Sequence, residues 1–217
     1  MSTIACYTPE QMEEIVEFIT QNYEGEGYIA HETESEYVHT DVYIAEDEEN
    51  DMRDFITFGM GAALMDAPIE TFERMELIMH TSLNTSLECC KWREAASFLV
   101  GLSKYPFRND TWFGWGHTVD VPKYFEDIFG YQFVLLAPTY LAFSPCDTTN
   151  NVENVIFSEI VPIYEDEREW IVANDSFVYL DLLYNKFGDD MFKVDVKREH
   201  YIPSEEDVLS LEEKEQK

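Results

Sequence analysis

Hydrophobic residues in this 217-residue chain change their spacing several times, from the helical period to the strand period and back. Apolar side chains recur every three or four residues after Thr8, from about residue 85 to Leu102, and again after Glu165, which predicts amphipathic helices. Five other segments have strand character, namely 37–45, 53–60, 73–81, 131–138 and 154–164. This order predicts an α/β (mixed α+β) domain with a mostly antiparallel or mixed central sheet flanked by helices.

Local signals place several of these elements. Thr8 and Gln11 are spaced as a capping box with Pro9 at the first helical position, so a helix should begin there and end near Gly25. The segments 37–45 and 53–60 should form a hairpin, because the acidic sequence between them, EDEENDM, belongs in solvent.

The end of the chain gives weaker signals. Gly188 is placed to end the last amphipathic helix, and MFKVDV at 191–196 suggests a short final strand. The sequence contains no internal repeat and no Gly/Ser linker, so residues 1–203 are expected to form a single domain. Residues 204–217 are expected to form an acidic, flexible C-terminal tail, because they are too polar to pack.

Charge narrows the class of partner. The chain has 45 acidic and 14 basic residues, a formal charge of −31, and none of its first 52 residues is Lys or Arg although fifteen are acidic. Such a chain repels nucleic acid and anionic lipid, so binding to nucleic acid or membrane is not expected. Its field would speed encounter with a basic protein. The alternative is that the acidity only maintains solubility.

The expected location is the cytoplasm. The first residues have neither the basic nor the apolar region of a secretory leader, and no apolar run is long enough to span a bilayer. Four cysteines, in no metal-ligand spacing, are expected to be reduced and mostly buried thiols.

Motifs for catalysis, cofactors or metals are not found in the sequence. GMG at 59–61 lacks the spacing of a dinucleotide-binding loop, so its glycines are expected to permit a sharp reversal or a close backbone approach. GLSKY at 101–105 lacks the second glycine of a nucleophile elbow. His39 and Asp41 share one side of the predicted strand, where a hydrogen-bonded pair is favoured over a metal site. No catalytic residue, cofactor or metal is therefore assigned.

The segment NDTWFGWGHTV at 109–119 is the candidate site. If residues 112–119 are extended, two glycines two residues apart leave a flat groove that a ring, a backbone or a bound peptide could fill. The favoured interpretation is that Trp112 or a nearby helix covers these glycines, with His117 a hydrogen-bonded structural residue. The candidate protein-binding residues are Asp110, Trp112, Gly114, Trp115, Gly116 and His117.

Several of these segments together resemble one family. In order, HTDVYIA, FITFGMGAALMDAP, ERMELIM, LSKYPFRNDTWFGWGHTV and EIVPIYEDE, between Glu36 and Glu167, are similar to the suppressor of fused domain, and most similar to its bacterial single-domain members.

The resemblance implies a non-enzymatic protein-binding domain with a mixed sheet. Animal members grip an extended peptide between this domain and a second one. No second domain is visible in this sequence, so addition of a strand to an exposed sheet edge is the compatible mode. For bacterial members the resemblance implies an immunity protein that neutralises a cognate toxin, which here would be basic. The alternative function is a small-ligand-binding protein or enzyme with a pocket near Trp115 and His117.

Overall fold

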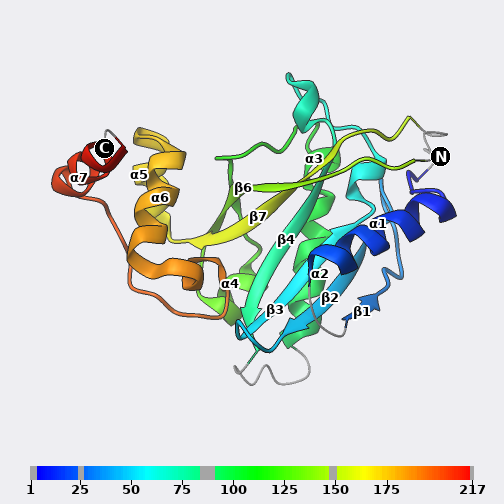
Figure 1. Cartoon of the computed structure of the whole chain (residues 1–217), viewed down its shortest axis with the longest axis horizontal. Helices are drawn as coiled ribbons and strands as arrows, with labels where there is room; N and C mark the ends of the chain where they lie inside the picture. Colours follow the sequence, from blue (N-terminus) through cyan, green and yellow to red (C-terminus); the bar gives the residue numbers. More distant parts are fainter. Residues whose placement is uncertain (1–3, 24–26, 84–90, 147–150, 216–217) are drawn as a thin grey trace.

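A computed structural model gives the architecture of the chain and describes residues 4–23, 27–83, 91–146 and 151–215. These residues form a seven-stranded sheet with the order β1-β2-β3-β4-β7-β6-β5. Helices lie on both faces of the sheet, and the last helices extend beyond one end of it (Figure 1). The fold is the predicted one, a mixed sheet flanked by helices.

The strands are β1 (Gly27–Ala30), β2 (Asp41–Asp47), β3 (Met52–Phe58), β4 (Met75–Ser82), β5 (Thr118–Asp120), β6 (Phe133–Phe143) and β7 (Val155–Ile163). The α-helices are α1 (Pro9–Asn22), α2 (Lys91–Ser103), α3 (Tyr105–Arg108), α4 (Lys123–Phe129), α5 (Glu165–Ala173), α6 (Ser176–Phe187) and α7 (Glu205–Glu215). The 3-10 helices are η1 (Met60–Ala62), η2 (Glu70–Phe72) and η3 (Gly188–Phe192).

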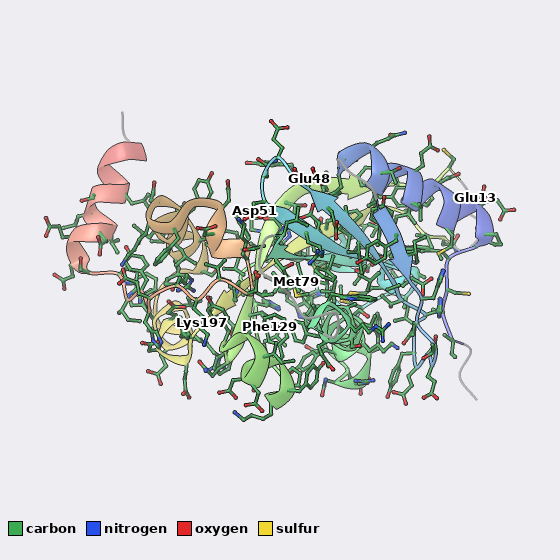
Figure 2. All side chains as sticks on the ribbon, turned by 90° about the horizontal axis from the view of Figure 1, so that it is seen from below. Glu13, Glu48, Asp51, Met79, Phe129 and Lys197 are labelled. Carbon is green, nitrogen blue, oxygen red and sulfur yellow. The ribbon has the colours of Figure 1, made fainter. Side chains whose placement is uncertain are left out.

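The elements with strong local signals lie where the sequence predicts them. Thr8 caps α1 through the expected capping box, in which its hydroxyl accepts from the Gln11 backbone N–H at 3.2 Å. Strands β2 and β3 form the expected antiparallel hairpin, with Asp47 opposite Met52. Figure 2 shows Glu48 pointing outward from the hairpin tip, while Met79 lies among the side chains of the interior. The predicted start of α2 before Lys91 lies outside the described residues.

The sheet is mixed because of one pairing. Strand β4 pairs with β7 in parallel, with Met75 opposite Ile156, and the other neighbouring strands are antiparallel. The parallel pair lies at the centre of the sheet, so all eight residues of β4 are buried. The alternation of polar and apolar residues in β4 therefore does not mark a solvent-exposed face.

One face of the sheet, called here the first face, is continuously apolar. Side chains from β2 to β6, including Phe55, Met79 and Leu136, form a single buried cluster. Helices α2 and α4 cover this face with residues such as Leu99 and Phe125, which are fully buried.

The opposite face, called here the second face, carries two separate apolar clusters. One lies under α1 and includes Ile15, Ile56 and Phe157. The other lies under α5 and α6 and includes Leu183 and Val161. Alternate residues of β7 share this face, which places Glu159 between the two clusters.

A polar network occupies this gap. His80 Nδ1 lies 2.7 Å from Asp54 Oδ1, and His80 Nε2 lies 3.8 Å from Glu159 Oε1. His80 and Asp54 are buried, whereas the Glu159 side chain is 26% exposed. The second face is thus divided by charge, and the first face is not.

The C-terminal segment is fastened to α5 by a buried ion pair. Glu167 and Arg198 are joined by a hydrogen bond of 2.7 Å between Arg198 Nη2 and Glu167 Oε2. The same carboxylate accepts from the backbone N–H groups of Tyr164 at 2.9 Å and Tyr201 at 2.8 Å. This arrangement holds the chain after η3 against the end of the sheet.

Three predictions near the end of the chain and at the cysteines need correction. Residues 191–196 form no strand, because η3 continues through Phe192 and only an isolated bridge joins Lys193 to His80. Helix α7 occupies most of the predicted tail, and Val208 and Leu211 pack against the cluster under α6, so the segment is not too polar to pack. Flexibility of residues 204–217 stays a prediction. Cys6 and Cys146 are exposed rather than buried, and Cys89 and Cys90 lie outside the described residues.

Candidate functional site

The candidate segment at 109–119 is a loop that turns sharply before β5. Gly116 has a φ of +85°, and the His117 N–H donates to the Gly114 carbonyl at 3.1 Å. The turn then joins β6, because Gly116 N–H donates to the Leu136 carbonyl at 2.7 Å and Leu136 N–H donates to the His117 carbonyl at 2.9 Å. Residues 112–119 are not extended throughout, which was the condition for a flat groove, since Gly116 adopts a left-handed conformation that reverses the chain.

The space beside both glycines is filled from within the domain. A β-carbon at Gly114 would lie 2.4 Å from Cζ3 of Trp112, and one at Gly116 would lie 2.4 Å from Oγ of Ser176, the first residue of α6. The favoured interpretation of the glycines is therefore confirmed, because Trp112 covers one and a nearby helix covers the other. No bound peptide could lie directly on these glycines without displacing those side chains.

Both tryptophans of the segment pack against η2. The ring centroid of Phe72 lies 5.7 Å from that of Trp112 and 5.3 Å from that of Trp115, edge to face in the second case. The Trp115 indole N–H is buried and has no hydrogen-bond partner among the described residues. The rest of the Trp115 side chain is partly buried and packs against the apolar cluster of the first face.

His117 is held as a neutral side chain. Its ring centroid lies 4.4 Å from that of Trp112. Burial lowers the pKa of His117 below its ordinary value, and a hydrogen bond with the Trp112 backbone opposes this shift. The imidazole therefore offers a nitrogen for hydrogen bonding near neutral pH rather than a fixed positive charge.

A groove runs along β5, beside these residues. One cavity of about 470 Å³ is lined by Trp112, His117 and Thr118, and another of about 370 Å³ by Asp120, Pro122 and Tyr124. Both cavities are lined by Tyr105, whose side chain is 39% exposed. We call the two cavities together the β5 groove. Because β5 is a terminal strand of the sheet, one of its backbone edges has no neighbouring strand among the described residues.

The six predicted site residues do not form one surface. Trp112 and His117 line the β5 groove, while Gly114 and Gly116 are packed against the interior. Asp110 is exposed, lies in a turn and has a φ of +47°. Sequence reasoning missed Tyr105 and Tyr124, because aromatic residues next to helix patterns are ordinarily assigned to the core.

The GMG motif at 59–61 permits a close backbone approach, and its N–H groups also bind a buried carboxylate that the sequence did not predict. Gly59 has a φ of +129°, and a β-carbon there would lie 2.1 Å from the His39 carbonyl oxygen, as expected for a close backbone approach. The N–H groups of Gly59 and Gly61 both donate to Glu76 Oε1, at 2.8 and 3.0 Å. Glu76 is fully buried on β4, which explains a carboxylate within an apolar strand.

The predicted His39 and Asp41 pair is present, within a larger polar cluster. His39 Nε2 lies 3.3 Å from Asp41 Oδ1, and His31 Nδ1 lies 2.9 Å from Asp41 Oδ2. Among the residues that the structure describes, no three His, Cys, Asp or Glu side chains are arranged to hold a metal ion. The helices described here also include none with the length and apolar character needed to cross a membrane.

The domain has a mixed sheet between helical layers, and an open terminal strand lies beside an aromatic groove. These features are typical of an α/β binding module. Residues 36–199 match the family described as Suppressor of fused protein (SUFU), and the chain therefore belongs to that family. No curated protein matches the sequence.

Two solved structures show the same fold. The crystal structure of Drosophila Suppressor of Fused is similar with a TM-score of 0.68 and 16% identity over 97% of this chain. A structure described as the Sufu-Fu complex has a TM-score of 0.63 and 15% identity, and the match covers 96% of each chain. This chain spans 56% of the Drosophila chain.

Proposed function

We propose that this chain is a non-enzymatic protein-binding domain that receives an extended segment of its partner along the β5 groove. The observation that carries the proposal is an open strand edge beside two cavities that are both lined by Tyr105. An added strand would pair with the β5 backbone, while its alternate side chains enter the cavities. A relative solved as a complex with Fu supports protein binding as the family's mode.

We further propose that the partner is basic, and that the domain acts in the cytoplasm as an immunity protein against a basic toxin. The formal charge of −31 supports this partner, because long-range attraction accelerates encounter between opposite charges. The charge also makes the binding sensitive to salt.

A photocrosslinking experiment tests the groove. A photoreactive amino acid placed at Tyr105 should capture a basic partner in cells of the source organism, and capture should fall when salt is raised to about 0.5 M. The matched control is the same substitution at Tyr140, which is fully exposed on β6. Equal capture from both positions would contradict the groove.

The immunity role and the small-ligand alternative have separate readouts. If the captured partner is toxic, co-expression of this chain should restore growth, and Tyr105→Ala should reduce that protection. Growth that is not restored would contradict immunity while leaving partner binding intact. A small molecule that copurifies with the chain and is lost in His117→Ala would instead favour the ligand-binding alternative.

A further inference from the structure

Helix α2 contains a glycine that neither the backbone nor the packing of the domain requires. Gly101 lies two residues before the last residue of the helix. The other glycines that the structure describes each have a positive φ or a neighbouring atom less than 3 Å from the position of an added β-carbon. Gly101 has neither, and a β-carbon added there would point into open space. It does not end the helix either, because Lys104, which follows α2, keeps a right-handed conformation with a φ of −93°.

This glycine lowers the stability of the helix without a visible gain to the fold. Glycine inside a helix is less favourable than alanine, because it loses more backbone freedom when the chain folds. Since a β-carbon at Gly101 would cause no clash within the domain, packing does not account for the glycine. The space that it leaves is available to a group from outside the domain.

The open space beside Gly101 belongs to the smaller cavity of the β5 groove, which has a volume of about 370 Å³. The helical wall of this cavity is formed by Phe98, Gly101, Leu102 and Tyr105, which follow one another at intervals of three or four residues. The facing wall is formed by Val121, Pro122 and Tyr124, which follow β5 or lie in α4. The cavity is therefore mainly apolar, and its helical wall is lowest at Gly101.

Aromatic side chains of the cavity are held in place by the core. The Phe98 ring centroid lies 3.9 Å from that of Phe125 on α4, and the Tyr105 ring stacks on Phe113 at 5.8 Å. Tyr105 and Tyr124 remain 39% and 41% exposed, so their rings are accessible from solvent. Walls fixed in this way reduce the entropy lost when a ligand binds.

Charge does not select the group that enters this cavity. Asp120 and Arg108 both line it and carry opposite charges, and Arg108 lies 3.2 Å from Glu36 in an exposed ion pair. The long-range attraction of a basic partner comes from the whole chain, whereas the side chain that enters here is selected by size and shape.

We propose that Gly101 determines the specificity of the β5 groove, by leaving room in the smaller cavity for one large aromatic side chain of the partner. This inference rests on the proposed function and adds the kind of residue that the partner presents there. An aromatic ring fits walls that contain Phe98, Tyr105 and Tyr124, because ring pairs gain free energy beyond the area that they bury. A buried aromatic anchor of this kind carries much of the binding free energy of an interface.

Peptides that differ in one residue test the anchor on the full chain. Each labelled peptide has alternating Thr and Lys residues around a central Trp, Leu or Ala. We expect the Trp peptide to bind about tenfold more tightly than the Ala peptide, with the Leu peptide between them, because the ring fills the cavity. NMR shift changes should appear at the Gly101 amide and at the β5 amides.

The outcomes separate this inference from the proposed function. Equal affinity of the Trp and Ala peptides, with shift changes still at β5, would overturn the aromatic anchor and leave strand addition in place. Absence of binding by every peptide would contradict both.

Gly101→Ala gives two readouts of opposite sign. Its urea and thermal midpoints should rise, because alanine favours the helix and meets no neighbour. Its affinity for the Trp peptide should fall about threefold or more, because the added methyl group narrows the cavity, while its affinity for the Ala peptide should not change.

Ser97→Ala is the matched control, because Ser97 is an exposed residue of the same helix that does not line this cavity. It should also raise stability, but it should leave the affinity for the Trp peptide unchanged. A loss of stability in Gly101→Ala would reveal a packing role for the glycine, and unchanged affinity for the Trp peptide would show that the partner does not use the space. Either result would refute the role of Gly101 in specificity.

Discussion

The two faces of the sheet show two different ways of filling an interior. The first face is a single apolar layer under α2 and α4, whereas the second face holds two apolar clusters separated by Asp54, His80 and Glu159. A continuous apolar face gains its stability from the area removed from water and from close packing. A divided face depends in addition on each buried charge keeping its partner. The stability of the second face should therefore depend on pH, whereas the stability of the first face should depend on the volume of its side chains.

The largest loss of stability is expected for a substitution on the first face. Phe55 is fully buried, so Phe55→Ala should lower the free energy of unfolding by about 3–5 kcal/mol through lost burial and a residual cavity. Urea denaturation measures the loss, and hydrogen exchange shows which strands share it. Protection should fall from β2 to β6, and a loss confined to the β2–β3 hairpin would contradict the continuity of this face.

The second face should lose stability as the pH rises. Burial alone would lower the pKa of His80, but hydrogen bonds and charge interactions with Asp54 and Glu159 raise it from 6.5 to about 9. Because the folded pKa is raised, the contribution of protonated His80 is fully present below pH 6.5 and is lost as the pH rises through about 9. The whole contribution is on the order of 3 kcal/mol.

The matched variant for this test is His80→Gln. The stability difference between the wild-type protein and the variant, from urea titrations, should shrink between pH 6.5 and 9.5. Other titrating groups near the network, such as Tyr23, whose pKa burial raises, are common to both proteins. A difference that stays constant with pH would show that His80 is not a charged partner in the folded state.

A smaller loss of stability is expected at Glu76, the buried carboxylate of β4. Glu76 accepts from the hydroxyls of Tyr7 at 2.8 Å and Thr57 at 2.6 Å, besides the two glycine N–H groups. Glu76→Gln should cost about 2 kcal/mol, because neutral hydrogen bonds replace charge-assisted ones. Thermal and urea unfolding measure the cost, with the exposed Glu70→Gln as control. Equal stability of the two variants would mean that the charge of Glu76 contributes nothing.

The smallest effect is expected for Glu159→Gln. Its carboxylate is partly exposed and 3.8 Å from His80 Nε2, so solvent screens the interaction and the cost should be about 1 kcal/mol. A double-mutant cycle with His80→Gln isolates the coupling between the two side chains. A coupling as large as that between His80 and Asp54 would mean that solvent screens the gap between the clusters less than the exposure of the Glu159 side chain indicates.

Sequence reasoning could predict the elements whose signals are local. The capping box of α1, the β2–β3 hairpin and the Gly188 helix end each depend on residues within a few positions of one another. The parallel β4–β7 pair could not be predicted, because no local pattern fixes which distant strand a buried strand joins.

The buried carboxylates could not be recognised for a similar reason. Glu76 alternates with apolar residues as a solvent-facing residue would, and only the fold brings Tyr7 and the two glycines to it. At the candidate site, the closing of the glycine groove by Trp112 was foreseeable from neighbouring residues. The role of Ser176 was not, since it is 60 positions away from Gly116 in the sequence.

Both edge strands of the sheet are short, with four residues in β1 and three in β5. An edge of that length offers few backbone groups to another copy of the protein, and copies that each carry a large negative charge repel one another. Short edge strands and like charge therefore both oppose sheet-to-sheet aggregation of this chain.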